Sequence, residues 1–389
     1  MPATTADPSL PYRLRLPGPT AIPERVRYAI SQPVVNHRGP EFHACYDHVQ
    51  ELIRPVLGTQ NAVFFFSSSG TGVMEASLVN ILAPGERLLV VINGQFGERF
   101  AAIAKILGAH VDLLEVPWGE AVDPAAIERQ VKTTDYRAVV VVHNESSTGV
   151  VTDLAGIGAV LRERPTLLVA DSVSGLAGLE MRQDEWGVDI VVSASQKCLM
   201  CPPGAGLASM SPRAWEIVKR EDRLARLYWD FRRAAAASEK SETSFTGPVS
   251  LMAGLQQALE MIHEEGLPQV LARHKRLANA LRAGCAALGL LPFGQESSLS
   301  STVVVVKIPA NLNGGDIVRR LYERYRTVIA GARNKLAGKI IRIGTMGHLH
   351  EADILMDLAY LEEILKELGH PIPPRAGVEA AEALLNCRR

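Results

Sequence analysis

The sequence predicts an α/β protein in which a mostly parallel, doubly wound sheet precedes a smaller α+β domain at the C-terminal end. Between residues 60 and 210, short apolar runs alternate with amphipathic stretches of helical length. The apolar runs are solid, which is typical of strands that helices cover on both faces. After about residue 265 this alternation stops, and 389 residues are about right for two domains.

The predicted elements follow one another in an order that suits this architecture. In the first part, strands are expected at 62–66, 87–92, 111–116, 138–143, 166–170, 188–193 and 206–210. Helices are expected between them, near 71–82, 97–107, 124–132 and 154–164. The second part is expected to contain helices at 267–288, 315–325 and 351–368 and strands at 301–308 and 339–344. We therefore predict an N-terminal arm over residues 1–20, a large domain over 21–265 and a small domain over 266–389.

The composition is that of an ordinary globular protein, with 47% hydrophobic residues, 21% charged residues and a formal net charge of −1. No apolar run approaches the roughly 20 residues that cross a bilayer. The first residues lack the basic and then apolar pattern of a signal peptide. No basic cluster suggests a nucleic-acid groove. We therefore expect a cytoplasmic protein that binds neither membranes nor nucleic acid.

The cysteines argue against both a disulfide framework and a metal site. Their number is five, and they are widely spaced, so a complete set of disulfides is excluded. Cys198 and Cys201 form a CxxC-like pair, but no second pair stands at zinc spacing. No bound metal is therefore expected.

Polar clusters follow four of the predicted strands, where open α/β sheets bind their ligands. The first cluster runs from Ser67 to Gly72, directly before a predicted helix. Its glycines allow a tight turn, and its hydroxyls and the N–H groups of the helix start can bind an anion. A serine-rich turn with an N-cap is the alternative interpretation.

Two further clusters contain single charged residues at the ends of buried strands. Asp171 follows a predicted strand, and a buried carboxylate there needs a partner such as a protonated pyridine nitrogen. A cap on the next turn is the alternative. Lys197 follows another strand, where loss of water contact lowers the pKa of an amine and makes it a nucleophile for an aldehyde. A lysine that reaches solvent is the alternative there.

The fourth cluster, from His143 to Gly149, follows the strand at 138–143. Ser146 could donate a hydrogen bond to a ring hydroxyl or to a nearby carboxylate. His143 and Glu145 could form an acid/base pair, although residues in such positions more often orient the loop.

In order and spacing, these residues resemble the class V aminotransferases, in the branch of alanine–glyoxylate and serine–glyoxylate (serine–pyruvate) aminotransferases. The similarity extends over nearly the whole chain, and its most specific parts are residues 145–149, 171–173 and 195–204. The resemblance implies the fold type I of enzymes that use pyridoxal 5'-phosphate (PLP), with PLP as the cofactor.

The resemblance also implies roles for individual residues. Lys197 would hold PLP as a Schiff base and serve as the base that moves the substrate proton, and Asp171 would bind the pyridinium nitrogen. Arg342 would hold the substrate carboxylate as a bidentate fork. The other implied contacts are Ser69, Gly70, Thr71 and Gln196 at the phosphate, Phe96 stacked on the ring, Ser146 near the ring's 3-hydroxyl, and Gly18 and Ser146 at the substrate.

In this family each active site borrows residues from the partner subunit, so the resemblance implies a homodimer with shared sites. The matching stretch in this sequence is 243–248. Thr246 fits the phosphate-binding threonine of the family. Thr243 stands where some relatives carry tyrosine, so this contact is expected to be weaker or lost.

The implied reaction is transamination between alanine or serine and glyoxylate or pyruvate. Pyridoxamine–pyruvate and ureidoglycine–glyoxylate aminotransferases share most of these motifs and stay open as alternatives, as does a non-catalytic homologue. A cysteine desulfurase would need a cysteine on a mobile loop, whereas Cys285 lies in a helix-like stretch. A dinucleotide-binding dehydrogenase would need a GxGxxG motif after the first strand.

Overall fold

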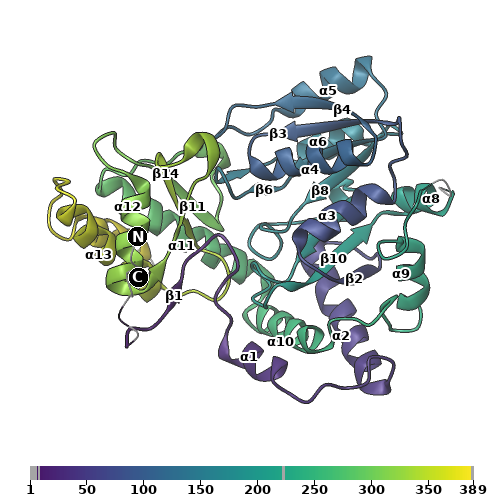
Figure 1. The fold of residues 1–389 in the computed structure, drawn as a ribbon, viewed down its shortest axis with the longest axis horizontal. Coiled ribbons are helices and arrows are strands. Elements are labelled where there is room, and N and C mark those ends of the chain that lie inside the picture. Colours follow the sequence, from purple (N-terminus) through teal and green to yellow (C-terminus); the bar gives the residue numbers. More distant parts are fainter. Residues whose placement is uncertain (1–6, 8, 221–223, 387–389) are drawn as a thin grey trace.

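The computed structural model describes residue 7, residues 9–220 and residues 224–386. Two packed units lie beside each other, a larger one around a seven-stranded sheet and a smaller C-terminal one (Figure 1). The strand order of the large sheet is β2-β10-β9-β8-β5-β3-β4. Its strands are β2 (Val63–Ser68), β3 (Arg87–Ile92), β4 (His110–Glu115), β5 (Ala138–Val142), β8 (Leu167–Asp171), β9 (Ile190–Ala194) and β10 (Gly204–Met210).

The large sheet is parallel except at one strand, which confirms the predicted fold class. The strands β4, β3, β5, β8 and β9 pair with parallel neighbours. β10 runs antiparallel to both β9 and β2. It follows β9 after residues 195–203 alone, a connection too short for the crossover that a parallel strand needs.

Helices cover both faces of this sheet, as the solid apolar strands predict. Successive strand residues enter different hydrophobic clusters: Phe65 packs on one face, Phe64 on the other. The first face is covered by α2 (Pro40–Leu57), α5 (Pro124–Thr133), α6 (Leu154–Leu161) and α10 (Val249–Glu265). The second face is covered by α3 (Gly70–Val79), α4 (Gln95–Ile106), α8 (Pro212–Arg220) and α9 (Phe231–Ser238).

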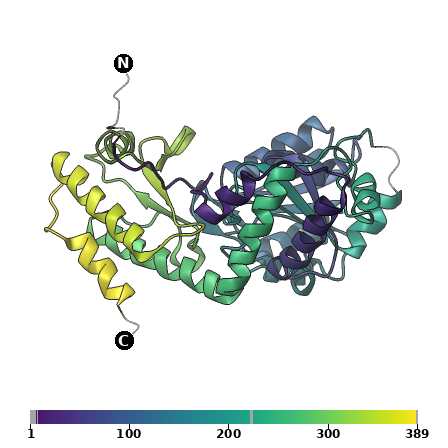
Figure 2. The ribbon, with the colours of Figure 1, turned by 90° about the horizontal axis from the view of Figure 1, so that it is seen from below.

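The C-terminal unit has its own core around a small antiparallel sheet, β11-β14-β13. These strands are β11 (Val303–Lys307), β13 (Ala330–Gly331) and β14 (Ile340–Gly344). Its helices are α11 (Leu267–Ala287), α12 (Gly314–Tyr325), α13 (Glu351–Glu367) and α14 (Ala376–Leu385). Figure 2 shows α10 and α11 meeting between the two units. No helix within the described ranges is long and apolar enough to cross a membrane.

The N-terminal segment crosses from the small unit to the large one. β1 (Arg13–Leu14) pairs with β12 (Thr327–Val328), and α1 (Glu24–Ile30) packs against α10. The buried Asp357 of α13 forms ion pairs with Arg13 at 2.9 Å and with Arg15 at 2.6 Å. These contacts attach the segment to the C-terminal unit before it reaches the large sheet (Figure 1). The division into an arm and two domains at residues 20 and 265 stays a proposal.

Candidate active site

All four predicted clusters meet at one edge of the large sheet. β5, β8 and β9 are adjacent and parallel, so the loops that leave their carboxyl ends share an edge. His143 and Lys197 lie in two of these loops, and Asp171 is the last residue of β8. β2 runs parallel to β9 on the other side of β10, which brings the Ser67 to Gly72 turn to the same edge. The topology therefore assembles the predicted site.

Lys197 is a mostly buried amine that loses its proton readily. Its Nζ donates a hydrogen bond to the Pro17 carbonyl. Burial lowers the pKa of Lys197 from 10.5 to about 8, and the negative charge of Asp171 opposes this shift. The neutral, nucleophilic form of the amine is therefore accessible near physiological pH.

Residues 17–20 of the N-terminal segment cover Lys197. Thr20 binds the lysine loop twice, through its N–H to the Gln196 carbonyl at 3.2 Å and through its hydroxyl to the Lys197 carbonyl at 3.0 Å. Gly18 has φ +113°, and a Cβ there would lie 2.3 Å from Lys197 Nζ. The positive φ therefore favours glycine at this position beside the amine. The place of Gly18 at the substrate stays a prediction.

Asp171 ends β8 in a buried position. Burial raises the pKa of this carboxyl to about 6, and the Val173 N–H, which donates to Oδ1 over 2.8 Å, opposes the shift. Within the described ranges no other group donates a hydrogen bond to the carboxylate. Its second oxygen is therefore available to a donor such as a pyridinium N–H.

The turn between β2 and α3 has the features of an anion-binding helix start. Ser69 is the N-cap of α3, but its side chain makes no capping hydrogen bond, so the first N–H groups of the helix can bind a ligand. A Cβ at Gly70 would lie 2.9 Å from a methyl group of Val173. The missing side chain thus lets this turn pack against the loop that follows Asp171.

Phe96 is held at the start of α4 by a buried carboxylate. Glu145 Oε2 accepts hydrogen bonds from the N–H groups of Phe96 at 2.9 Å and Gly97 at 3.4 Å. Its Oε1 accepts from the N–H and hydroxyl of Ser147 at 3.0 and 2.6 Å. Glu145 therefore anchors the helix that presents Phe96. Sequence reasoning left this role undetermined, because the two partners lie 49 residues apart.

Arg342 enters the site from β14 of the C-terminal unit. Its Nε and Nη2 donate to the Gly331 carbonyl over 3.0 and 2.8 Å, and its Nη1 donates to the Ser146 carbonyl over 3.3 Å. Burial lowers the pKa of Arg342, and the charge of Glu145 opposes this shift. The predicted clamp and Ser146 thus lie together. The carbonyls that hold the guanidinium are neutral, so a substrate carboxylate can replace them favourably.

His143 lies in the interior of the protein. Its Nδ1 is 2.9 Å from Ser172 Oγ, and burial lowers its pKa to about 4. It is therefore neutral at physiological pH and holds the loop next to Asp171, which favours the orienting role over the acid/base role.

The stretch expected to reach a partner subunit lies near the turn of its own chain that is expected to bind phosphate. Ser67 Oγ donates to the Thr246 carbonyl over 3.4 Å, and Thr246 itself is exposed. The Thr243 hydroxyl donates to the Phe245 carbonyl over 2.7 Å, inside the same turn. The expected contacts of both threonines with a cofactor in a second subunit remain predictions.

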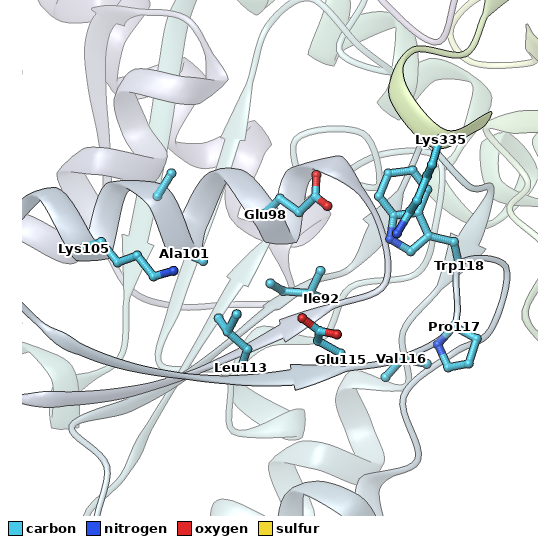
Figure 3. A pocket seen from close by; sticks show the side chains of 11 residues that line it. Ile92, Glu98, Ala101, Lys105, Leu113, Glu115, Val116, Pro117, Trp118 and Lys335 are labelled. Atoms are coloured by element: carbon cyan, nitrogen blue, oxygen red, sulfur yellow. The ribbon is translucent and has the colours of Figure 1, made fainter. Parts of the chain in front are cut away.

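A hollow of about 610 Å³ lies outside this site, between α4 and the edge strand β4. Glu98, Lys105, Trp118 and Lys335 border it (Figure 3). Lys335 belongs to the short helix η2 (Asn334–Leu336), and its Nζ lies 3.7 Å from the centroid of the Trp118 ring. This contact joins the two units beside the site. Of the described residues that line the hollow, none was predicted to bind cofactor or substrate.

Comparison with known proteins establishes the family. Residues 20–346 match the family Aminotransferase class-V. The chain belongs to the class-V aminotransferases. This confirms the family that the sequence motifs predict, and with it an enzyme that transfers amino groups and uses PLP.

Individual class-V aminotransferases are similar over almost the full chain. The L-aspartate–glyoxylate aminotransferase of Paracoccus denitrificans is 38% identical, with 94% of each chain covered. The serine–glyoxylate aminotransferase of Arabidopsis thaliana is 35% identical, with 96% of this chain and 95% of the relative covered. The solved ureidoglycine–glyoxylate aminotransferase of Bacillus subtilis has a TM-score of 0.93 and 31% identity, covering 97% of this chain and 98% of that one. The predicted fold type I is thereby confirmed.

The residues at the sheet edge fit PLP. Gln196 Oε1 is buried without a hydrogen-bond partner in the described protein, so this oxygen can accept a hydrogen bond from a ligand beside Lys197. The free oxygen of Asp171, the open start of α3 and the amine of Lys197 supply partners for a ring nitrogen, a phosphate and an aldehyde. PLP carries all three of these groups.

Proposed function

We propose that this aminotransferase moves the amino group of a small amino acid, alanine or serine, to glyoxylate or pyruvate. The observation that carries the proposal is the pairing of Lys197 and Asp171 at one end of the site with Arg342 at the other. The named relatives support glyoxylate as the acceptor, because an aspartate– and a serine–glyoxylate aminotransferase are both more than one third identical to the chain.

Each residue of this set has a distinct task. When bound, PLP supplies an aldehyde and an electron-withdrawing ring that weakens the α-C–H bond of an amino acid. Lys197 provides the amine that holds the cofactor, and its lowered pKa allows Nζ to accept and return the substrate's α-proton. Asp171 keeps a proton on the ring nitrogen by its negative charge. Arg342 fixes the substrate carboxylate, which directs the α-carbon toward Lys197.

We also propose that the active enzyme is a homodimer in which residues 243–248 reach the partner's cofactor. Large apolar side chains exposed in this chain support the proposal, notably Tyr28 at 70% and Val34 at 74% exposure. Burial of such side chains favours association. Thr246 lies at the surface, next to the turn that begins α3, where a neighbouring subunit can be reached. The cytoplasmic location expected from the sequence stays a prediction.

The proposal is tested first at Lys197. Purified protein with PLP is expected to absorb at the edge of the visible range, and Lys197→Ala is expected to remove this band and to lower transamination by at least about 10³-fold. Lys105→Ala on the surface of α4 is the matched control and should retain both. A Lys197→Ala protein that keeps the wild-type rate would contradict the proposal.

The substrates are tested with a panel of alanine, serine and aspartate against glyoxylate and pyruvate, measured as 2-oxo acid formed. Turnover with alanine or serine is the expected result. Turnover of pyridoxamine and pyruvate, without bound PLP, would favour the pyridoxamine–pyruvate alternative. Turnover with ureidoglycine alone would favour the ureidoglycine–glyoxylate alternative.

A further inference from the structure

Arg99 touches two groups of the cofactor site, although neither the motifs nor the family roles above include it. It lies on α4, one helical turn after Phe96. Its Nη1 donates a hydrogen bond to Thr71 Oγ1 over 2.9 Å. Its guanidinium carbon lies 4.9 Å from the centroid of the Phe96 ring, within the range of a cation–π contact. Arg99 therefore connects a residue expected at the phosphate with the residue expected to cover the pyridine ring.

The charge of Arg99 is not balanced by a neighbouring side chain. Among the residues that the structure describes, no carboxylate forms an ion pair with it. The preceding residue, Glu98, borders the hollow beside β4 instead (Figure 3). The expected ligands of the phosphate are all neutral: Ser69, Gly70, Thr71, Gln196 and Thr246. Arg99 is exposed in the single chain, and a phosphate bound by Thr71 at the start of α3 would lie beside its positive charge.

The same guanidinium acts on both reactive groups of the site. Burial is the main cause of the lowered pKa of Lys197 and of the raised pKa of Asp171, and Arg99 is among the charges that lower both. Its charge therefore reaches the region between the amine and the carboxylate, which is where the cofactor is expected to lie.

We propose that Arg99 is a positioning residue for the cofactor phosphate, which it serves by orienting Thr71, by offsetting the phosphate charge and by holding Phe96 against the ring. The inference rests on PLP being the cofactor of this chain. It predicts that Arg99 matters for a cofactor that carries a phosphate and matters much less for one that does not.

The test compares PLP with pyridoxal, which has the same ring and aldehyde but no phosphate. Apo-enzyme is titrated with each compound, and dissociation constants are taken from the visible absorbance band. Arg99→Gln is expected to weaken PLP binding roughly tenfold more than pyridoxal binding, as for the loss of a charge-assisted contact. Arg99→Lys keeps the charge and is expected to recover part of the loss. Added salt should weaken PLP binding less in Arg99→Gln than in wild type.

Two variants separate the charge from the support of the ring. Phe96→Leu is expected to weaken PLP and pyridoxal by the same factor, because it changes the ring contact and leaves the phosphate turn intact. Lys105→Gln removes a positive charge from the same helix and is expected to change neither constant. Thermal melting of each apo-variant shows that it is folded.

Three results would overturn the inference. Arg99→Gln could weaken PLP and pyridoxal equally, which would make Arg99 a structural residue of α4. It could leave both constants at the wild-type value. Wild-type protein that binds no PLP would overturn the inference together with the proposed function, so the wild-type titration distinguishes the two failures.

Discussion

Lys197 and Arg342, the cationic side chains at the two ends of the site, are held in opposite ways. Lys197 lies on the rim of the seven-stranded sheet, where burial lowers the pKa of its amine to about 8. Arg342 comes from the three-stranded sheet, and although burial lowers its pKa too, its N–H groups are met by the Gly331 and Ser146 carbonyls. Burial can make an amine neutral, but a guanidinium stays charged and needs acceptors.

This difference matches the different roles that the two units are proposed to have at the site. The large sheet supplies a residue whose proton can move, and the small sheet supplies a residue whose charge is fixed. The first must be shielded from water, because contact with water would restore the ordinary pKa of the amine. The second must be able to exchange its carbonyl partners for a carboxylate.

The largest difference between substrate binding and cofactor binding is expected for a variant at Arg342. Arg342→Gln should raise the KM of the amino donor and lower kcat/KM by about 10²-fold, as for the loss of a bidentate, charge-assisted contact. The dissociation constant of PLP should stay at the wild-type value, because the cofactor contacts lie on the large sheet. Steady-state kinetics and a PLP titration of the same preparation measure both quantities. A large loss of PLP affinity would show that the ends are not independent.

A smaller effect is expected from the protonation of Asp171. Its pKa of about 6 lies above the ordinary value for an aspartate, so the carboxylate that pairs with the ring nitrogen is lost as the pH falls below about 6. Affinity should then fall by up to about tenfold per pH unit. Pyridoxal is the proper ligand for this titration, because the phosphate of PLP has a pKa of about 6 of its own. Asp171→Asn should flatten the profile, and an equally steep profile in that variant would contradict the assignment.

The smallest effect concerns the stability of the cofactor-free protein. The pKa of Lys197 is about 8 in the folded chain and 10.5 for an ordinary lysine, so the protonated amine destabilises the fold below pH 8, and this cost is gone above pH 10.5. Lys197→Met should therefore be more stable than wild type at pH 7, by at most about 3 kcal/mol. Thermal unfolding between pH 7 and pH 10.5 should show this advantage shrinking. An advantage that does not depend on pH would point to packing instead.

The strands of the large sheet were predictable because their apolar runs are uninterrupted. The expected strand at 87–92 is β3, and the one at 138–143 ends one residue earlier, as β5. The helices α2 and α10 were not identified. In α2 the buried Gln50 interrupts the apolar stripe, because its Oε1 accepts a hydrogen bond from the Val63 N–H over 3.1 Å, and Pro55 lies inside the helix. A buried polar residue that binds the backbone of another element interrupts the apolar periodicity by which a helix is recognised in a sequence.

The residues of the site likewise fall into those that the sequence indicated and those that only the structure revealed. Lys197 and Asp171 could be selected from the sequence because each is a charged residue at the end of a buried strand. Arg342 lies inside β14 and was selected through the family resemblance alone. Glu145 and Arg99 could not be assigned, because what they do depends on contacts between segments far apart in the chain. The Pro17 carbonyl that accepts a hydrogen bond from Lys197 belongs to the backbone, so it cannot be predicted from the type of any side chain.

The path of residues 13–20 has a practical consequence for protein engineering. This segment is attached to the C-terminal unit by β1 and by the ion pairs with Asp357. Its residue Gly18 nevertheless lies against Lys197 in the large unit. A chimera that joins the large sheet of one homologue to the C-terminal unit of another would have to divide this segment between the two parents. The residues that attach it to the C-terminal unit would then come from one parent and Gly18 from the other. The exchange would therefore change the surroundings of Lys197 even where the sheet itself is unchanged.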